Sequence, residues 1–265
     1  MRYVYPVVSR RAGGVSIGIN LNTNNACNWA CIYCQVDGLR RGGPPPIDLG
    51  MLARELEGFL TEVLTGDFLV RCVPEEARRL MDVAFSGNGE PTSAAEFAAA
   101  VALVVAALEN RQLLPRVTIR LITNGSLVHR VAVQEGIAAL GRAGGEVWFK
   151  VDRSGTAATA AVNGLAVDDD RVRRNLGLCA SLAPTWVQTC WFAIDGLAPD
   201  AEAEGAYCRL LAPVAGALRG IHLYGLARPS LQPGAAHLGR LTAAQLQGFA
   251  QRIETETGIK VLVSP

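Results

Sequence analysis

Six hydrophobic segments of strand length recur along the chain, and in most of them apolar residues follow one another directly. A strand covered on only one face alternates apolar and polar residues, whereas consecutive apolar residues indicate a strand that is buried on both faces. The expected strands are VSIGINLN from Val15, DVAFSGN from Asp82, VTIRLITN from Val117, EVWFKVD from Glu146, TWVQTCWF from Thr185 and GIHLYGLA from Gly220.

Helix-like stretches separate these segments, so that strands and helices alternate along the chain. This order, with connections mostly too long for hairpins, predicts an α/β fold with a parallel sheet. The sheet is either open and doubly wound or a full or partial barrel, and six units are too few for the standard closed eight. The expected helices cover residues 48–65, 93–110, 131–141, 168–183, 200–218 and 242–257, and Asp48 is expected to cap the first.

Length and charge narrow the class of protein. The 265 residues, half of them hydrophobic, suffice for one α/β domain over residues 1–265, and we find no internal repeat or linker. The formal net charge is +1 and there is no long run of Lys or Arg. This balance argues against a surface built mainly to bind nucleic acid or anionic lipid.

The cysteines and the N-terminal segment indicate a cellular compartment. The segment MRYVYPVVSRRAGG lacks an apolar stretch before a cleavage site, and no apolar run approaches bilayer length. Seven cysteines, three of them within eight residues, fit a metal or redox site better than a disulfide framework. We therefore expect a soluble, cytoplasmic protein without a membrane segment.

The segment NNACNWACIYCQVDG follows the first expected strand and carries Cys27, Cys31 and Cys34, with Tyr33 before the last cysteine. Three thiolates on one short loop can hold three irons of a cubane cluster and leave the fourth iron open, as a catalytic cluster requires. Structural zinc is the main alternative, but zinc needs four ligands, and no second cysteine pair or nearby histidine completes the set. Densely spaced core cysteines without a metal are a further alternative.

Glycine and polar residues follow the next two strands, at the edge of a parallel sheet where ligands bind. After the second strand come Gly87, Asn88, Gly89, Glu90 and Pro91, and glycines there let the backbone approach a ligand. After the third strand comes Thr123-Asn124-Gly125. Both segments also have a simpler interpretation, because such residues commonly form turns.

Charged and polar side chains occur on the later strands as well. Lys150 and Asp152 are two residues apart and share a face of the fourth strand, so they either pair with other charges or contact a ligand. Only Lys150 and Lys260 are lysines among 25 basic residues, which favours a specific role for Lys150. Weaker candidates for a substrate pocket are Gln188, Tyr224 and Arg228, because such residues are more often structural residues of the core.

The cysteine spacing and Tyr33 resemble the defining motif of the radical S-adenosylmethionine (radical SAM) superfamily. The resemblance implies a partial (β/α)6 barrel, a 4Fe-4S cluster on Cys27, Cys31 and Cys34, and reductive cleavage of S-adenosylmethionine to a 5′-deoxyadenosyl radical. It also implies cofactor contacts. Tyr33 would lie against the adenine, the turn Gly87-Asn88-Gly89-Glu90-Pro91 would bind the methionine amino group, and Asn124, Lys150 and Asp152 would contact the remainder. Asn88 stands where the family usually has a second glycine.

The segments GNGEPTS, VWFKVD and LYGLARP are most similar to the wyosine-synthesis-like group of this superfamily. The chain lacks that group's flavodoxin domain and additional N-terminal cysteines, so transfer RNA is not the favoured substrate. We expect an enzyme acting on a small molecule or peptide, with an electron donor such as flavodoxin or ferredoxin. The alternatives are an enzyme that modifies transfer RNA or activates a glycyl-radical protein, and a non-catalytic cluster-binding protein.

Overall fold

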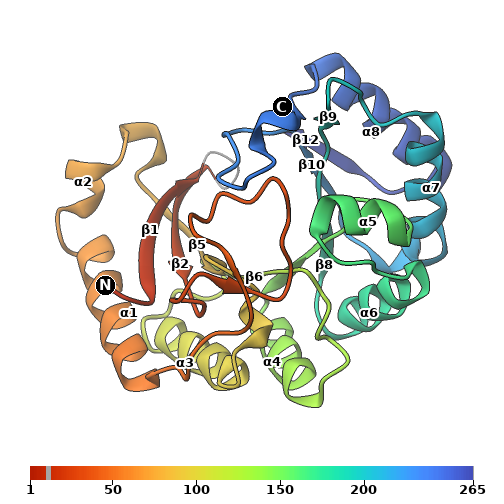
Figure 1. The fold of residues 1–265 in the computed structure, drawn as a ribbon. Coiled ribbons are helices and arrows are strands. Elements are labelled where there is room, and N and C mark those ends of the chain that lie inside the picture. The colour runs from red at the N-terminus through yellow and green to blue at the C-terminus, as the bar shows by residue number, and fades with distance from the viewer. Residues whose placement is uncertain (10–12, 265) are drawn as a thin grey trace. The chain divides into compact units, whose positions relative to one another are not determined.

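The computed structural model describes residues 1–9 and 13–264 and forms two compact units. The first unit comprises residues 1–28, 42–123 and 127–147, and the second comprises residues 29–41, 124–126 and 148–265. Each unit contains strands and helices in alternation (Figure 1). The predicted single domain over residues 1–265 stays a prediction, and the two units are described separately.

The strands of the first unit follow the order β1-β2-β5-β6. β1 and β2 pair antiparallel, whereas β2, β5 and β6 pair in parallel. Every residue of β2 is buried, as the run of consecutive apolar residues predicts. The elements are β1 (Val4–Ser9), β2 (Gly14–Ile19), β3 (Ala26–Cys27), α1 (Leu49–Leu64), α2 (Phe68–Cys72), β5 (Leu80–Phe85), α3 (Phe97–Asn110), β6 (Thr118–Thr123) and α4 (Val131–Arg142).

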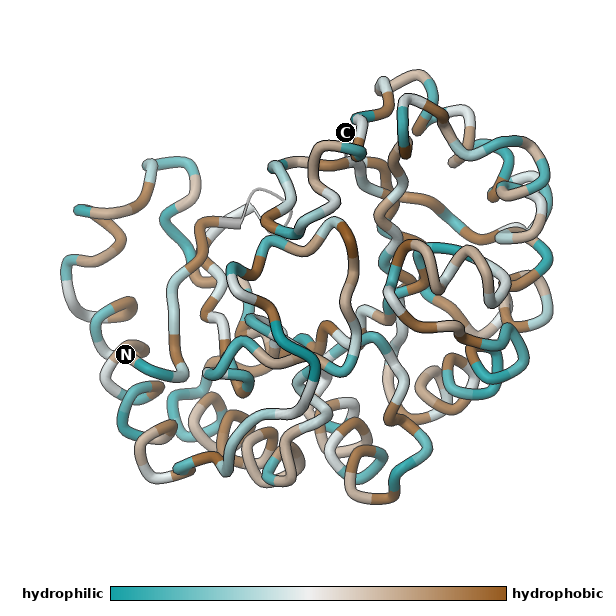
Figure 2. Tube along the Cα trace, in the orientation of Figure 1, coloured by the Kyte–Doolittle hydropathy of each residue, from teal (hydrophilic) through white to brown (hydrophobic). Residues whose placement is uncertain are grey.

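The helices of the first unit pack through apolar faces. α1 buries Leu52, Leu56, Phe59, Leu60 and Val63, whose spacing of three and four residues places them on one side of the helix. Asp48 caps this helix as predicted, because its side chain accepts a hydrogen bond of 2.8 Å from the backbone N–H of Met51. Hydrophobic and hydrophilic residues therefore alternate along the helices (Figure 2).

The strands of the second unit follow the order β7-β8-β10-β12, of which β7 begins in the first unit. β8, β10 and β12 pair in parallel. The elements are β4 (Arg40–Arg41), β7 (Glu146–Lys150), α5 (Thr156–Asn163), α6 (Asp169–Leu182), β8 (Thr185–Cys190), β9 (Ala193–Ile194), α7 (Ala201–Leu211), β10 (Gly220–Tyr224), β11 (Leu238–Gly239), α8 (Ala243–Thr257) and β12 (Val261–Ser264).

The structure shortens two of the predicted helices. The stretch 200–218 forms α7 only as far as Leu211 and continues as a 3-10 helix over Ala212–Ala217, at whose start Pro213 supplies no N–H. The stretch 93–110 becomes helical at Phe97, after a separate 3-10 turn over Pro91–Ser93. None of the helices in the described part of the chain combines the length and apolar character that crossing a membrane requires.

Candidate active site

The glycine-rich turn of the first unit follows β5 and lies close to the chain segment before Cys27. A Cβ atom on Gly87 would come within 2.6 Å of the Asn20 side chain, and a Cβ on Gly89 within 2.2 Å of the Ala26 carbonyl oxygen. Gly87 also has a φ of +129°, which side chains rarely permit. Both glycines are therefore required for this close approach.

Asparagine side chains fix the turn to that segment. The backbone N–H of Asn88 donates to Oδ1 of Asn20 at 3.2 Å, and Nδ2 of Asn88 donates to Oδ1 of Asn25 at 2.7 Å. Asn88 thus uses its side chain to hold the segment leading to Cys27. Sequence reasoning overlooked Asn20 and Asn25, although the run of asparagines before the cysteines was a usable signal.

Glu90 points into the first unit, with 2% of its surface exposed. Its Oε1 accepts hydrogen bonds from the hydroxyl of Thr92 at 2.6 Å and that of Thr123 at 2.5 Å. The Thr92 hydroxyl belongs to the 3-10 turn that begins at Pro91, and Thr123 ends β6. The carboxylate therefore ties the turn that follows β5 to the end of β6.

In the second unit, the cysteine loop is held by the end of α5 and by the loop after β10. The backbone N–H groups of Ala30 and Ile32 donate to the carbonyls of Asn163 and Val162 at 3.0 and 2.9 Å. The Ser230 hydroxyl donates to the carbonyl of Ile32 at 2.7 Å. These bonds come from parts of the chain 130 or more residues away, so the loop conformation depends on the folded unit.

Asp152 is the centre of a buried polar cluster beside this loop, and its side chain is fully buried. Oδ2 accepts hydrogen bonds from the hydroxyl of Tyr33 at 2.5 Å and from Nδ2 of Asn163 at 2.8 Å. Oδ1 accepts the backbone N–H of Cys190 at 2.9 Å and lies 3.8 Å from Nζ of Lys150. These donors compensate the negative charge that burial would otherwise make costly.

Lys150 and Asp152 lie together, as their period-two spacing predicts. Burial acts most strongly and lowers the pKa of Lys150, but Asp152 together with the nearby Tyr224, Cys31 and Cys190 outweighs burial and raises the pKa above its usual value. Nζ of Lys150 also donates to the hydroxyl of Tyr224 at 3.2 Å and lies 5.0 Å from the centre of the Tyr33 ring. Lys150 therefore stays a cation, flanked by two aromatic rings.

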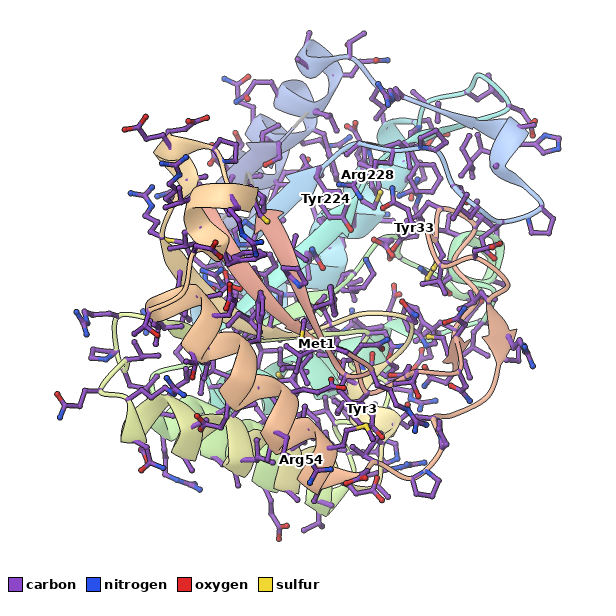
Figure 3. The ribbon with its side chains drawn as sticks, turned by 90° about the vertical axis from the view of Figure 1, so that its left-hand side faces the viewer. Met1, Tyr3, Tyr33, Arg54, Tyr224 and Arg228 are labelled. Carbon is purple, nitrogen blue, oxygen red and sulfur yellow. The ribbon has the colours of Figure 1, made fainter. Side chains whose placement is uncertain are left out.

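Tyr33 and Tyr224 pack against an apolar group formed by Val162, Cys190 and Phe192. Figure 3 labels both tyrosines in this unit. Removal of the two hydroxyls from water raises their pKa values, that of Tyr33 well above its usual range, with Asp152 adding to the effect. Burial likewise raises the pKa of the Cys190 thiol to about 12, so all three groups stay protonated at neutral pH.

The remaining predicted residues of the second unit have different surroundings. Gln188 is 5% exposed on β8, two residues before Cys190, whereas Arg228 is exposed on the loop after β10. Asn124 is buried, and its Oδ1 accepts hydrogen bonds from the N–H and the hydroxyl of Ser126 at 3.0 and 2.7 Å. Asn124 therefore also has a structural role, as a turn residue.

The three motif cysteines are all partly buried. Cys27 belongs to the first unit, and Cys31 and Cys34 belong to the second. Among the described residues, no three His, Cys, Asp or Glu side chains are already arranged to hold a metal ion. The fit of an iron–sulfur cluster therefore rests on the donor set, three thiols within eight residues, and on the polar groups that surround Cys31.

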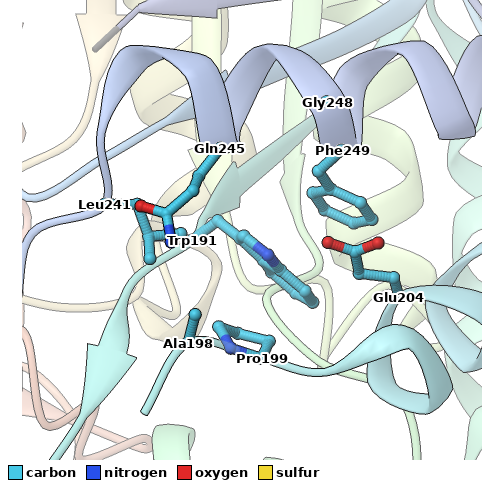
Figure 4. A pocket seen from close by; sticks show the side chains of 8 residues that line it. All are labelled: Trp191, Ala198, Pro199, Glu204, Leu241, Gln245, Gly248 and Phe249. Atoms are coloured by element: carbon cyan, nitrogen blue, oxygen red, sulfur yellow. The ribbon is translucent and has the colours of Figure 1, made fainter. Parts of the chain in front are cut away.

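A separate pocket of about 290 Å³ lies between α7 and α8 and contains none of the predicted site residues (Figure 4). Its wall includes Trp191, which stacks on Phe249 with the ring centres 4.3 Å apart. The guanidinium carbon of Arg153 lies 4.1 Å from the centre of the Trp191 ring. Arg153 also donates to the carbonyls of Asp152 and Cys190, so Trp191 packs behind the buried polar cluster.

Neither a family model nor a curated protein sequence matches the chain. Solved structures do. A radical SAM methyltransferase from Sphaerobacter thermophilus aligns with a TM-score of 0.61 at 16% identity, over 98% of this chain and 68% of its own. The enzyme anSMEcpe, with bound AdoMet and a peptide, gives 0.57 at 13% identity over 92% and 63%.

Coproporphyrinogen III oxidase from Escherichia coli, described as a radical SAM enzyme, gives a TM-score of 0.50 at 12% identity, over 90% of this chain and 51% of its own. At sequence identities this low, the alignments show a similar fold and nothing more specific. This similarity confirms the predicted α/β fold, a partial barrel of parallel strands as in radical SAM enzymes. The resemblance to the wyosine-synthesis-like group stays a prediction.

Proposed function

We propose that the chain is a radical SAM enzyme, which holds a 4Fe-4S cluster on Cys27, Cys31 and Cys34 and cleaves S-adenosylmethionine reductively. The observation that carries the proposal is the cysteine loop, whose Tyr33 binds the buried Asp152 beside the partly buried cation Lys150 at the end of β7. Ligand sites in such folds lie at the carboxyl ends of the strands. The shared fold supports the same conclusion.

A bound cluster would supply the electron that breaks the cofactor's sulfur–C5′ bond and yields the 5′-deoxyadenosyl radical, which takes a hydrogen atom from the substrate. The protein residues bind and orient. Lys150, kept charged by Asp152, suits a carboxylate such as that of methionine. Tyr33, oriented by its hydrogen bond to Asp152, offers a ring face to the adenine.

In the first unit, the turn from Gly87 to Pro91 would bind the methionine amino group through its backbone, because the side chains of Asn88 and Glu90 are engaged within the unit. Asn124 would contact the cofactor in addition to its role in the turn. The candidates for substrate contacts remain Gln188, Tyr224 and Arg228. Of these, Tyr224 lies within the candidate site, because its hydroxyl accepts a hydrogen bond from Lys150.

The proposed substrate is a small molecule or a peptide, and the proposed electron donor is a flavodoxin or a ferredoxin in the cytoplasm. The aligned structures carry names as different as methyltransferase and coproporphyrinogen oxidase. The fold therefore does not determine the substrate. Substrate choice depends on the residues that line the pocket. The low net charge supports a substrate other than nucleic acid.

The proposal is tested anaerobically. The reconstituted protein is reduced with dithionite, mixed with S-adenosylmethionine and assayed for 5′-deoxyadenosine, beside Cys31→Ala and a matched control, Cys72→Ala, whose cysteine is exposed outside the motif. We expect product from the wild type and from Cys72→Ala, and none from Cys31→Ala. A wild-type protein that holds its cluster without forming product would instead support the non-catalytic alternative.

A further inference from the structure

Asn163 is the last residue of α5 and is the polar group that α5 directs at the cysteine loop. Its surface is 1% exposed. Nδ2 lies 2.8 Å from Oδ2 of Asp152 and 3.3 Å from Sγ of Cys31. A side-chain amide has two N–H groups, so Asn163 can donate to the carboxylate and to the sulfur at the same time.

The orientation of this amide follows from its neighbours. Asp152 accepts hydrogen bonds from Tyr33 and from the backbone N–H of Cys190, so both of its oxygens act as acceptors here. The nitrogen of Asn163, not its oxygen, must consequently face Asp152. The backbone carbonyl of Asn163 accepts a hydrogen bond from the N–H of Ala30, which fixes the position of the side-chain amide relative to Cys31.

We propose that Asn163 is a positioning residue that donates an N–H···S hydrogen bond to the Cys31 thiolate and thereby raises the reduction potential of a cluster bound there. This inference rests on the proposed function. A donor to a cluster sulfur stabilises the reduced form more than the oxidised form, because the added electron increases the negative charge on the sulfurs. No protein bond is made or broken, and the electron comes from a low-potential one-electron donor.

Asp152 connects this effect to the cofactor residues. Its carboxylate accepts from Tyr33 and lies beside Lys150, and it also holds the second N–H of Asn163. The carboxylate of Asp152 is thus shared by Tyr33 and Lys150, which are proposed to contact S-adenosylmethionine, and by Asn163, which contacts Cys31. The position of the Asn163 amide relative to Cys31 depends on that shared contact.

The test is a potentiometric titration of the reconstituted protein, followed by electron paramagnetic resonance without S-adenosylmethionine. Asn163→Leu keeps most of the side-chain volume, and Asn163→Ala removes it. The matched control is Thr159→Ala, which removes a buried hydroxyl of the same helix that bonds to Val167 and not to the cysteine loop. We expect both Asn163 variants to lower the equilibrium constant for reduction about tenfold, about 59 mV for one electron, and the control to leave it unchanged.

The outcomes separate this inference from the proposed function. A wild-type protein that binds no cluster refutes the proposed function, and with it the inference. A loaded Asn163 variant whose potential equals that of the wild type refutes the inference alone. If the Asn163 variants fold but retain no iron, or if neither Asn163→Leu nor Asn163→Ala folds, Asn163 stabilises the loop. Either result also contradicts the proposed effect on the reduction potential.

Discussion

At the scale of single residues, burial decides which groups of the second unit carry a charge. Lys150 keeps its proton because Asp152 is beside it, whereas Cys190, with 1% of its surface exposed, keeps its proton because a buried thiolate would be poorly solvated. One residue is therefore a permanent cation and the other a neutral thiol.

The raised pKa of Cys190 predicts a pH-dependent stability. The unfolded thiol loses its proton near pH 9, the folded one near pH 12, so the folded state binds more protons between these values and stability falls as pH rises above about 9. Replacing Cys190 with Ala should remove about 1.4 kcal/mol of the loss between pH 7 and pH 10. Urea unfolding at both pH values measures this, and an identical loss in the wild type and the variant would contradict it.

Some contacts within the candidate site could be predicted from the sequence and others could not. Lys150 and Asp152 were found because two-residue spacing on a strand defines a shared face. Asn163 was missed because its contacts with Asp152 and Cys31 join parts of the chain that only the fold brings together. The bonds from Asn88 to Asn20 and Asn25 are long-range in the same way.

At the scale of elements, the six expected strands and six expected helices are present, because long hydrophobic patterns survive tertiary context. The hydrophobic pattern did not predict β1, β12, α5, the short helix α2 or the two-residue strands β3, β4, β9 and β11. β1 contains a proline and lies at an edge of its sheet. α5, with the sequence TAATAAVN, is short and mostly built of small residues, so it has no marked apolar face.

The edge strand β1 follows a short N-terminal segment that Glu55 of α1 holds. Its carboxylate accepts the backbone N–H groups of Arg2, Tyr3 and Val4 at 2.6, 2.8 and 3.1 Å. Partial burial acts to raise the pKa of Glu55, but these hydrogen bonds outweigh it and lower the pKa below its usual value. The stabilisation is thus present above the unfolded pKa and is lost as pH falls through the folded one.

Replacing Glu55 with Gln should therefore destabilise the protein at pH 7 by about 1 kcal/mol, since charge-assisted bonds become neutral ones and the site is partly screened by solvent. The difference between variant and wild type should shrink as the pH approaches 3. Thermal unfolding at pH 7, 5 and 3 measures it. A difference that is constant over this range would show that the charge of Glu55 is irrelevant.

Gly164 ends α5 and limits how closely the cysteine loop can approach. Its φ is +69°, and an added Cβ would lie 2.9 Å from the carbonyl oxygen of Ala30. Gly258 ends α8 with nearly the same φ, +70°, and an added Cβ there would meet nothing within 4 Å. The two glycines thus form a matched pair that separates backbone strain from contact with the loop.

Replacing either glycine with Ala should cost about 1 kcal/mol of stability, the penalty for a side chain in the left-handed region. Gly164→Ala should in addition displace the loop and lower the iron retained after reconstitution by at least half, whereas Gly258→Ala should retain the wild-type amount. Iron and sulfide analysis with urea unfolding tests this. Equal iron in both variants would contradict the role assigned to the end of α5.

At the scale of the whole molecule, the fold and the proposed chemistry depend on different features of the chain. The alternation of strands and helices predicted an α/β fold with a parallel sheet, the resemblance of the cysteine motif implied a partial barrel, and the solved structures confirm that fold. The chemistry rests on a short cysteine motif and on side chains at strand ends, where one fold can serve many reactions. The substrate could not be predicted, because the residues of a pocket are dispersed along the chain and have no fixed spacing.

The proposed function requires that three thiolates hold a cubane whose fourth iron remains open for S-adenosylmethionine. Electron paramagnetic resonance of the reduced, reconstituted protein, recorded with and without S-adenosylmethionine, tests it most directly. We predict the signal of one reduced 4Fe-4S cluster for each chain, and a changed signal after addition of S-adenosylmethionine. A protein that holds no such cluster, or whose cluster signal is the same with and without S-adenosylmethionine, would contradict the account.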